Sequence, residues 1–94
     1  MVELIDSHCH IDRVDLAPFD HSVERMLEAS RELDVSTMIC VCIDLENFPA
    51  IHSLALAYPS IYSSVGVHPT EEGVEEASLE KLLMLGALDK VVAI

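Results

Sequence analysis

The sequence has little positive charge. Its 94 residues include 5 Lys and Arg against 17 Asp and Glu, which gives a formal net charge of −12. A cationic nucleic-acid clamp needs clustered Lys and Arg to meet phosphates, so this composition argues against that class of protein. No apolar run approaches the roughly 18 residues of a membrane span, and the first residues show neither the basic start nor the long apolar stretch of a secretory signal. We therefore expect a cytoplasmic protein with no membrane partner.

Cysteine is also scarce, with Cys9, Cys40 and Cys42 as the three thiols and no CxxC motif. On a strand, Cys40 and Cys42 would share one face, as a soft-metal or redox pair requires. Free cysteine is among the most buried residue types, and we expect small core residues here instead. Hydrophobic residues make up 51% of the chain, enough apolar surface for the core of one small domain and too much for a disordered one.

Apolar runs and helical patterns alternate along the chain. The runs predict strands over residues 2–6, 37–43, 61–67 and 91–94. Helices are predicted between them, with caps at Asp20, Asn47 and Ser78 and a stop at Gly86. The residues expected on the buried helix stripes are Val23, Met26, Leu27 and Leu33, then Ile51, Leu54, Ala55 and Tyr58, then Leu79, Leu82, Leu83 and Leu85.

This alternation is typical of an α/β fold with a parallel sheet and right-handed crossovers. The strands are apolar at both parities, which indicates a sheet covered by helices. Because the chain stops inside an apolar run, we expect residues 1–94 to be the truncated N-terminal part of one larger domain. Four βα units are the first half of a TIM (β/α)8 barrel. A small open α/β sheet is the alternative.

The strongest chemical signal is DSHCHID, after the first predicted strand. His8 and His10 are two residues apart, so an extended backbone projects both imidazoles to the same side. Two imidazoles that converge form half of a divalent-metal site, at the strand end where βα folds place their active sites. Asp6 shares their parity and is expected to hold a histidine ring. Two ordinary loop histidines are the alternative.

A second signal is SVGVHPT, at the end of the third predicted strand. Gly66 would allow close backbone approach or a bulge, and Pro69 favours an extended His68. On a barrel, His68 would share the rim with His8 and His10, where it could orient a phosphate, transfer a proton or approach the metals. A turn histidine is the alternative. His21 and His52 fall in helical segments and are expected to be solvent-facing or packed.

Charged residues near these motifs have plainer interpretations. The acidic residues Glu71, Glu72, Glu75 and Glu76 are expected to form a solvated loop and not a metal cluster. Asp12 is expected to pin the loop after the histidine pair. Arg13 is one of few cations near the expected site.

Three motifs in order, LIDSHCHID, VGVHPTE and VVAI, resemble the TatD-like metal-dependent hydrolases of the amidohydrolase superfamily, over all 94 residues. The resemblance implies a (β/α)8 barrel, one or two divalent ions (magnesium, manganese or zinc) and hydrolysis of DNA phosphoesters. It implies His8 and His10 as metal ligands and His68 as an active-site histidine. In the family, the segment like VVAI continues into a Gly-Glu that bridges the metals, and later strands supply further ligands.

The expected function is therefore deoxyribonuclease activity through metal-activated water, with DNA as the partner. Two alternatives stay open. One is hydrolysis of an amide or ester, such as an aminoacyl-nucleic-acid bond, because fold and metals do not fix the substrate. The other is a non-catalytic half-barrel, and the 94 residues alone are expected to be inactive.

Overall fold

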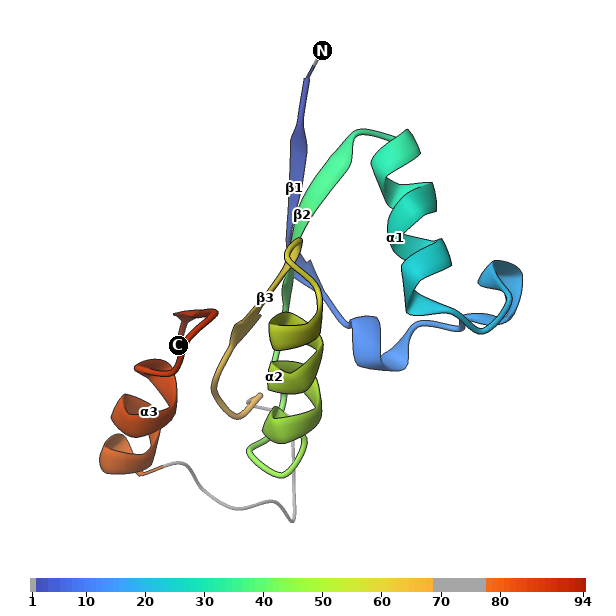
Figure 1. Ribbon diagram of the computed structural model, residues 1–94. Helices are drawn as coiled ribbons and strands as arrows, with labels where there is room; N and C mark the ends of the chain where they lie inside the picture. The colour runs from blue at the N-terminus through green and yellow to red at the C-terminus, as the bar shows by residue number, and fades with distance from the viewer. Residues whose placement is uncertain (1, 69–77) are drawn as a thin grey trace.

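Four strands and three α-helices alternate along the chain, as the sequence predicts. The computed structural model describes residues 2–68 and 78–94. The elements in order are β1 (Leu4–Cys9), the 3-10 helices η1 (Ile11–Arg13) and η2 (Ala17–Phe19), α1 (Val23–Glu32), β2 (Val35–Cys40), α2 (Phe48–Ala57), β3 (Ile61–Ser64), α3 (Leu79–Gly86) and β4 (Val91–Ala93). Figure 1 shows the three α-helices following one another around the strands.

The four strands form one sheet in the order β1-β2-β3-β4, and each neighbouring pair is parallel. Spatial order equals chain order, so each strand joins the next through a connection that holds a helix. This is the arrangement of half a TIM barrel, which confirms the predicted fold class. All four strands end at the same edge of the sheet, and the segments that come after them lie together there.

Strand β1 extends further than its apolar run. The predicted strand stopped at residue 6, but β1 continues through Ser7 and His8 to Cys9. Parallel pairing with β2 carries the extended backbone on, with Cys9 opposite Cys40. The amide of Val41 then donates a 2.8 Å hydrogen bond to the Cys9 carbonyl. Consequently His8 lies on the strand and not in the loop beyond it.

The core lies between one face of the sheet and the helices. On β3 and the residue after it, Ile61, Ser63 and Val65 are buried, whereas Tyr62 and Ser64 are half-buried. The buried face packs with residues of α1 and α2: Met26, Leu27, Phe48, Ile51 and Ala55. The expected helix cover is therefore found on this face, and burial alternates along the strand. The opposite face corresponds to the interior of a barrel.

Three helix predictions were wrong in detail: one cap and the buried stripes of two helices. The N-cap of α1 is Ser22, whose hydroxyl accepts a 3.2 Å hydrogen bond from the Arg25 amide. Asp20 has a left-handed φ of 56° and lies before the cap. Leu33 is 75% exposed because α1 ends at Glu32. Leu79 and Leu83 are also exposed, since α3 turns Leu82 and Leu85 toward the core instead.

Helix α3 ends at Gly86, as predicted, and β4 passes close to this residue. A Cβ atom at position 86 would lie 3.0 Å from Cδ1 of Ile94. Glycine therefore permits the close contact between the end of α3 and the residue after β4. Within the described parts of the chain, no helix has the length and apolarity that crossing a membrane requires.

Candidate metal centre

The structure brings the rings of His8 and His10 together at the end of β1. Their centroids are 5.2 Å apart, and the ring planes meet at 81°. Two imidazoles that bind one zinc ion through nitrogens at about 2.0–2.1 Å place their centroids about 5 Å apart. The observed separation therefore fits a shared divalent ion. His8 lies on β1 and His10 directly follows the last residue of the strand, so the two side chains leave the backbone on the same side, as alternation along a strand predicts.

One nitrogen of this pair has an unmet hydrogen-bonding need. The Nδ1 atom of His10 is buried and has no hydrogen-bond partner among the described residues. Leaving a buried polar atom unpaired costs about 1–3 kcal/mol. An ion or another bound group at this nitrogen would remove that cost. The buried nitrogen is thus a second observation, independent of the ring spacing, that fits a ligand at this place.

The pair is only part of a metal site. In residues 2–68 and 78–94, no three His, Cys, Asp or Glu side chains gather in a way that could hold an ion. Closed zinc sites use four protein ligands, and catalytic sites use three with an open position. His8 and His10 would therefore supply two positions, and further groups would have to complete the coordination.

Asp6 does not hold a histidine ring, contrary to the prediction. Its Oδ1 accepts a 3.1 Å hydrogen bond from the backbone amide of His8. The pairing register with β2 shifts between Asp6 and Cys9, so the strand is irregular here, and the carboxylate bonds to the nearby main chain. Asp6 thus supports the backbone that carries His8.

The three thiols are small core groups, as the sequence predicts. Cys40 and Cys42 are buried, and Cys9 donates a 3.3 Å hydrogen bond to the Ile39 carbonyl. Burial raises the pKa of all three, that of Cys9 to about 12, with the nearby Asp6 charge adding to the Cys9 shift. The thiols are therefore protonated near neutral pH, whereas metal ligands and nucleophiles need the thiolate.

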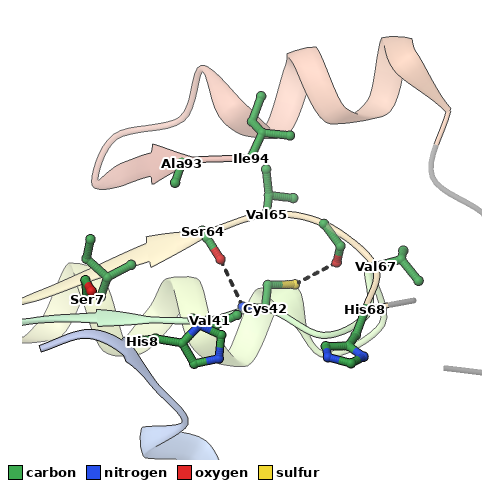
Figure 2. Close-up of a pocket in the computed structure, with 12 residues that line it drawn as sticks. Ser7, His8, Val41, Cys42, Ser64, Val65, Val67, His68, Ala93 and Ile94 are labelled. Atoms are coloured by element: carbon green, nitrogen blue, oxygen red, sulfur yellow. Dashed lines mark hydrogen bonds between the residues drawn. The ribbon is translucent and has the colours of Figure 1, made fainter. Parts of the chain in front are cut away.

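His68 comes after β3 and lines the same pocket as His8 (Figure 2). The pocket has a volume of about 340 Å³ and lies where the first three strands end. Its lining residues are Ser7, His8, Ile39, Val41, Cys42, Ser64, Val65, Gly66, Val67, His68, Ala93 and Ile94. The predicted shared rim of His8 and His68 is thus observed. His10 lies beside His8 and does not line this pocket.

Ser64 is a pocket residue that was not predicted from the sequence. Its Oγ accepts a 3.1 Å hydrogen bond from the Cys42 amide (Figure 2). The Cys42 thiol donates to the carbonyls of Asp44 and Gly66. The sequence offered one signal for Ser64: it is a polar residue near the end of an apolar strand, on the face opposite to that of Ser63. The expected close approach at Gly66 is absent among the described atoms, since a Cβ there would meet none within 4 Å.

The other candidate residues lie outside the histidine pair and the pocket. His52 stacks on Phe48, and its Nε2 is 2.9 Å from the Asp89 carbonyl, while His21 is exposed, as predicted for both. Asp12 bonds to Asn47 across the loops, which confirms its pinning role. Arg13 is 3.9 Å from Asp12. The predicted acidic loop residues, Glu71, Glu72, Glu75 and Glu76, lie outside the described residues.

Comparison with known proteins agrees with this geometry. The family model described as "TatD related DNase" matches residues 5–94. The uncharacterized metal-dependent hydrolase YjjV of Escherichia coli K12 is 34% identical over 79 residues, which are 83% of this chain and 29% of YjjV. YcfH of the same strain, also named a metal-dependent hydrolase, is 30% identical over 91 residues, which are 97% of this chain and 34% of YcfH.

A third relative is the metal-dependent hydrolase BU355 of Buchnera aphidicola, 38% identical over 66 residues, or 70% of this chain and 25% of BU355. The chain thus spans about a third or less of the length of these relatives. The family match nevertheless covers nearly all of the chain, including both histidine motifs up to His68. The chain belongs to the TatD-related DNase family.

Proposed function

We propose that the protein carrying this chain is a divalent-metal-dependent hydrolase that cleaves phosphodiester bonds of DNA. The observation that carries the proposal is the convergence of His8 and His10, with rings 5.2 Å apart, at the strand ends where βα folds place their chemistry. These two imidazoles would hold one ion, of magnesium, manganese or zinc. When bound, such an ion supplies Lewis-acid activation of water and of a phosphoryl oxygen. A cytoplasmic location, expected from the sequence, stays a prediction.

His68 would act from the opposite part of the pocket. Its backbone is fixed by a 2.7 Å hydrogen bond from its amide to the Ile43 carbonyl, and its imidazole shares the pocket with that of His8. An imidazole can hold or release a proton beside a reacting phosphate. We assign His68 to contact with the scissile phosphate and to proton transfer.

One observation favours a second substrate class. Among the described residues, those that line the pocket include serines and histidines but neither Lys nor Arg. A long duplex would meet few cations here, so the pocket suits a strand end or a short oligonucleotide. It also suits a neutral ester or amide, such as an aminoacyl-nucleic-acid bond, which the same metal chemistry would hydrolyse.

The test is an assay of the whole protein that carries this chain, stripped of metal and then given Mg²⁺, Mn²⁺ or Zn²⁺. End-labelled single- and double-stranded oligonucleotides and an aminoacyl ester are offered in parallel. We expect DNA cleavage that depends on the added metal. His8→Ala should abolish this cleavage, and the control variant His21→Asn, at an exposed histidine, should preserve it. Cleavage of the ester alone would replace the proposed substrate. DNA cleavage that survives His8→Ala and His10→Ala would reject the proposed site.

A further inference from the structure

The histidine loop, residues 10–13, is attached to the start of α2. The side-chain Nδ2 of Asn47 donates a 2.6 Å hydrogen bond to Oδ2 of Asp12, across 35 residues of sequence. The Asp12 side chain is only 12% exposed. We propose that Asp12 and Asn47 are positioning residues that hold His10 in place beside His8. This proposal rests on the metal site proposed above and deepens it.

His10 needs such support because it lies beyond the strand. Strand β1 ends at Cys9, and His10 has a φ of −126° and a ψ of 71°, outside both strand and helix geometry. The sheet therefore fixes the backbone that carries His8 but does not fix His10. The single turn of η1 comes directly after His10, and its Arg13 amide donates a 2.9 Å hydrogen bond to the His10 carbonyl. The direction of the His10 ring thus depends on where η1 is held.

Two contacts hold η1. Ile11 is 3% exposed and belongs to the core, and Asp12 bonds to Asn47 on the other side of the turn. The thiol of Cys40 also lies 3.7 Å from Oδ1 of Asp12, so both carboxylate oxygens face donors. The turn after His10 is therefore attached both to the core and to the loop between β2 and α2.

Asn47 is itself well fixed. Its backbone amide donates a 2.7 Å hydrogen bond to the Asp44 carboxylate, and it occupies the N-cap position of α2. The sequence predicts that its side chain caps that helix. The side chain makes no capping hydrogen bond and bonds to Asp12 instead. The Asn47 side chain therefore contacts the histidine loop and does not cap α2, which is the usual role of Asn at the N-cap position.

Groups that orient metal ligands without touching the ion matter strongly for affinity. Loss of such a partner typically weakens metal binding about 10–100-fold. Ligand nitrogens need placement within about 0.5 Å, which an unsupported loop does not give. Asp12 and Asn47 act on His10 through the chain and do not enter the ion's coordination in this assignment.

The test exchanges the two side chains in the whole protein that carries this chain, where the remaining ligands are present. An Asn at position 12 keeps a carbonyl oxygen that can still accept from Asn47, so the disrupting single variants are Asp12→Leu and Asn47→Asp, the second of which leaves two carboxylates facing each other. The double variant Asp12→Asn/Asn47→Asp restores one amide-to-carboxylate hydrogen bond in the reverse direction, at unchanged net charge. Asp15→Asn is the matched control, because Asp15 is in the same connection and its carboxylate accepts only a local hydrogen bond, from the Ala17 amide.

Zn²⁺ is titrated into each variant while the NMR signals of the His8 and His10 imidazoles are monitored. We expect each single variant to bind Zn²⁺ about 10–100-fold more weakly and to lose the nuclear Overhauser contact between the two rings. The double variant should recover both, with an affinity within about threefold of the original, and Asp15→Asn should behave like the unsubstituted chain.

The outcomes separate the two proposals. Single variants with unchanged Zn²⁺ affinity and ring contact would overturn the positioning role while leaving the metal site intact. A double variant that is unfolded, or that binds no better than either single variant, would overturn it as well. If Zn²⁺ leaves the His8 and His10 signals of the unsubstituted chain unchanged, or if His8→Ala binds equally well, the metal site itself fails.

Discussion

The backbone amide of His68 donates a 2.7 Å hydrogen bond to the carbonyl oxygen of Ile43. This bond joins the segment after β3 to the segment after β2 and fixes the main chain from which the His68 ring projects. The main chain of this exposed residue is thus held at the pocket that its side chain lines. The main chain sets where residue 68 lies, and the imidazole supplies its chemistry. A substitution of His68 should therefore remove the chemistry and leave the main chain in place.

Replacing His68 should therefore lower the rate of the reaction more than it lowers the affinity for the metal ion. In the whole protein, His68→Ala should lower kcat by about 10²–10⁴-fold, the usual contribution of a proton-transferring side chain. Metal affinity should change less than about threefold, because His68 is not assigned as a ligand. Steady-state kinetics and a metal titration on the same preparation check both. Loss of metal binding with unchanged kcat at saturating metal would contradict the assigned role.

The buried face of the sheet should dominate stability. Ile51 is fully buried between α2 and the strands, so Ile51→Ala should lower the free energy of unfolding by about 2–5 kcal/mol, and Ile51→Val by about 0.5–1.5 kcal/mol. Leu56→Ala is the control on the same helix, since Leu56 is 57% exposed, and should cost far less. Urea unfolding measured by circular dichroism compares all three. Equal losses at positions 51 and 56 would contradict the described core.

The N-terminus of α1 gives a smaller and more local effect. The Ser22 hydroxyl accepts the Arg25 amide, so Ser22→Ala should lower the free energy of unfolding by about 1 kcal/mol. Asp20→Asn should leave it nearly unchanged, because asparagine tolerates the same left-handed backbone. Thermal unfolding of the two variants compares them directly. A Ser22→Ala variant as stable as the unsubstituted chain would contradict the described cap.

Alkaline pH should destabilise the fold through its thiols. Burial raises the pKa of Cys9 from 9.0 to about 12 and raises those of Cys40 and Cys42 as well. Between pH 9 and about 12 the unfolded chain loses thiol protons that the folded chain keeps. The free energy of unfolding should therefore be level with respect to these groups below pH 9 and fall above it. Urea titrations across this range should show a shallower fall for Cys9→Ala.

Much of the fold was predictable because local pattern decided it. The apolar runs located all four strands, and the Ser78 cap and the Gly86 stop of α3 were both found. The end of β1 was missed because pairing with β2, and not apolarity, carries the strand through Ser7 and His8. The exposure of Leu33 depends on the point where α1 stops, which stripe periodicity does not fix.

The histidine pair was predictable for the same reason, since the alternation of a strand is a local property. Only one partner of the Asp12–Asn47 hydrogen bond was predictable from the sequence. Asp12 could be expected to pin its loop, but its partner lies 35 residues away and has the pattern of an ordinary helix cap. Only the parallel register of β1 and β2, which places the loops after them side by side, brings the two residues together.

The contact between Gly86 and Ile94 links two regions that would otherwise be unrelated. Ile94 forms part of the pocket wall, and the end of its side chain lies where a methyl group on residue 86 would come within 3.0 Å of it. An alanine at the end of α3 would make the exposed Ile94 side chain give way by a few tenths of an ångström, without touching any histidine. The outline of the pocket is therefore linked to a residue of α3 that does not itself line it.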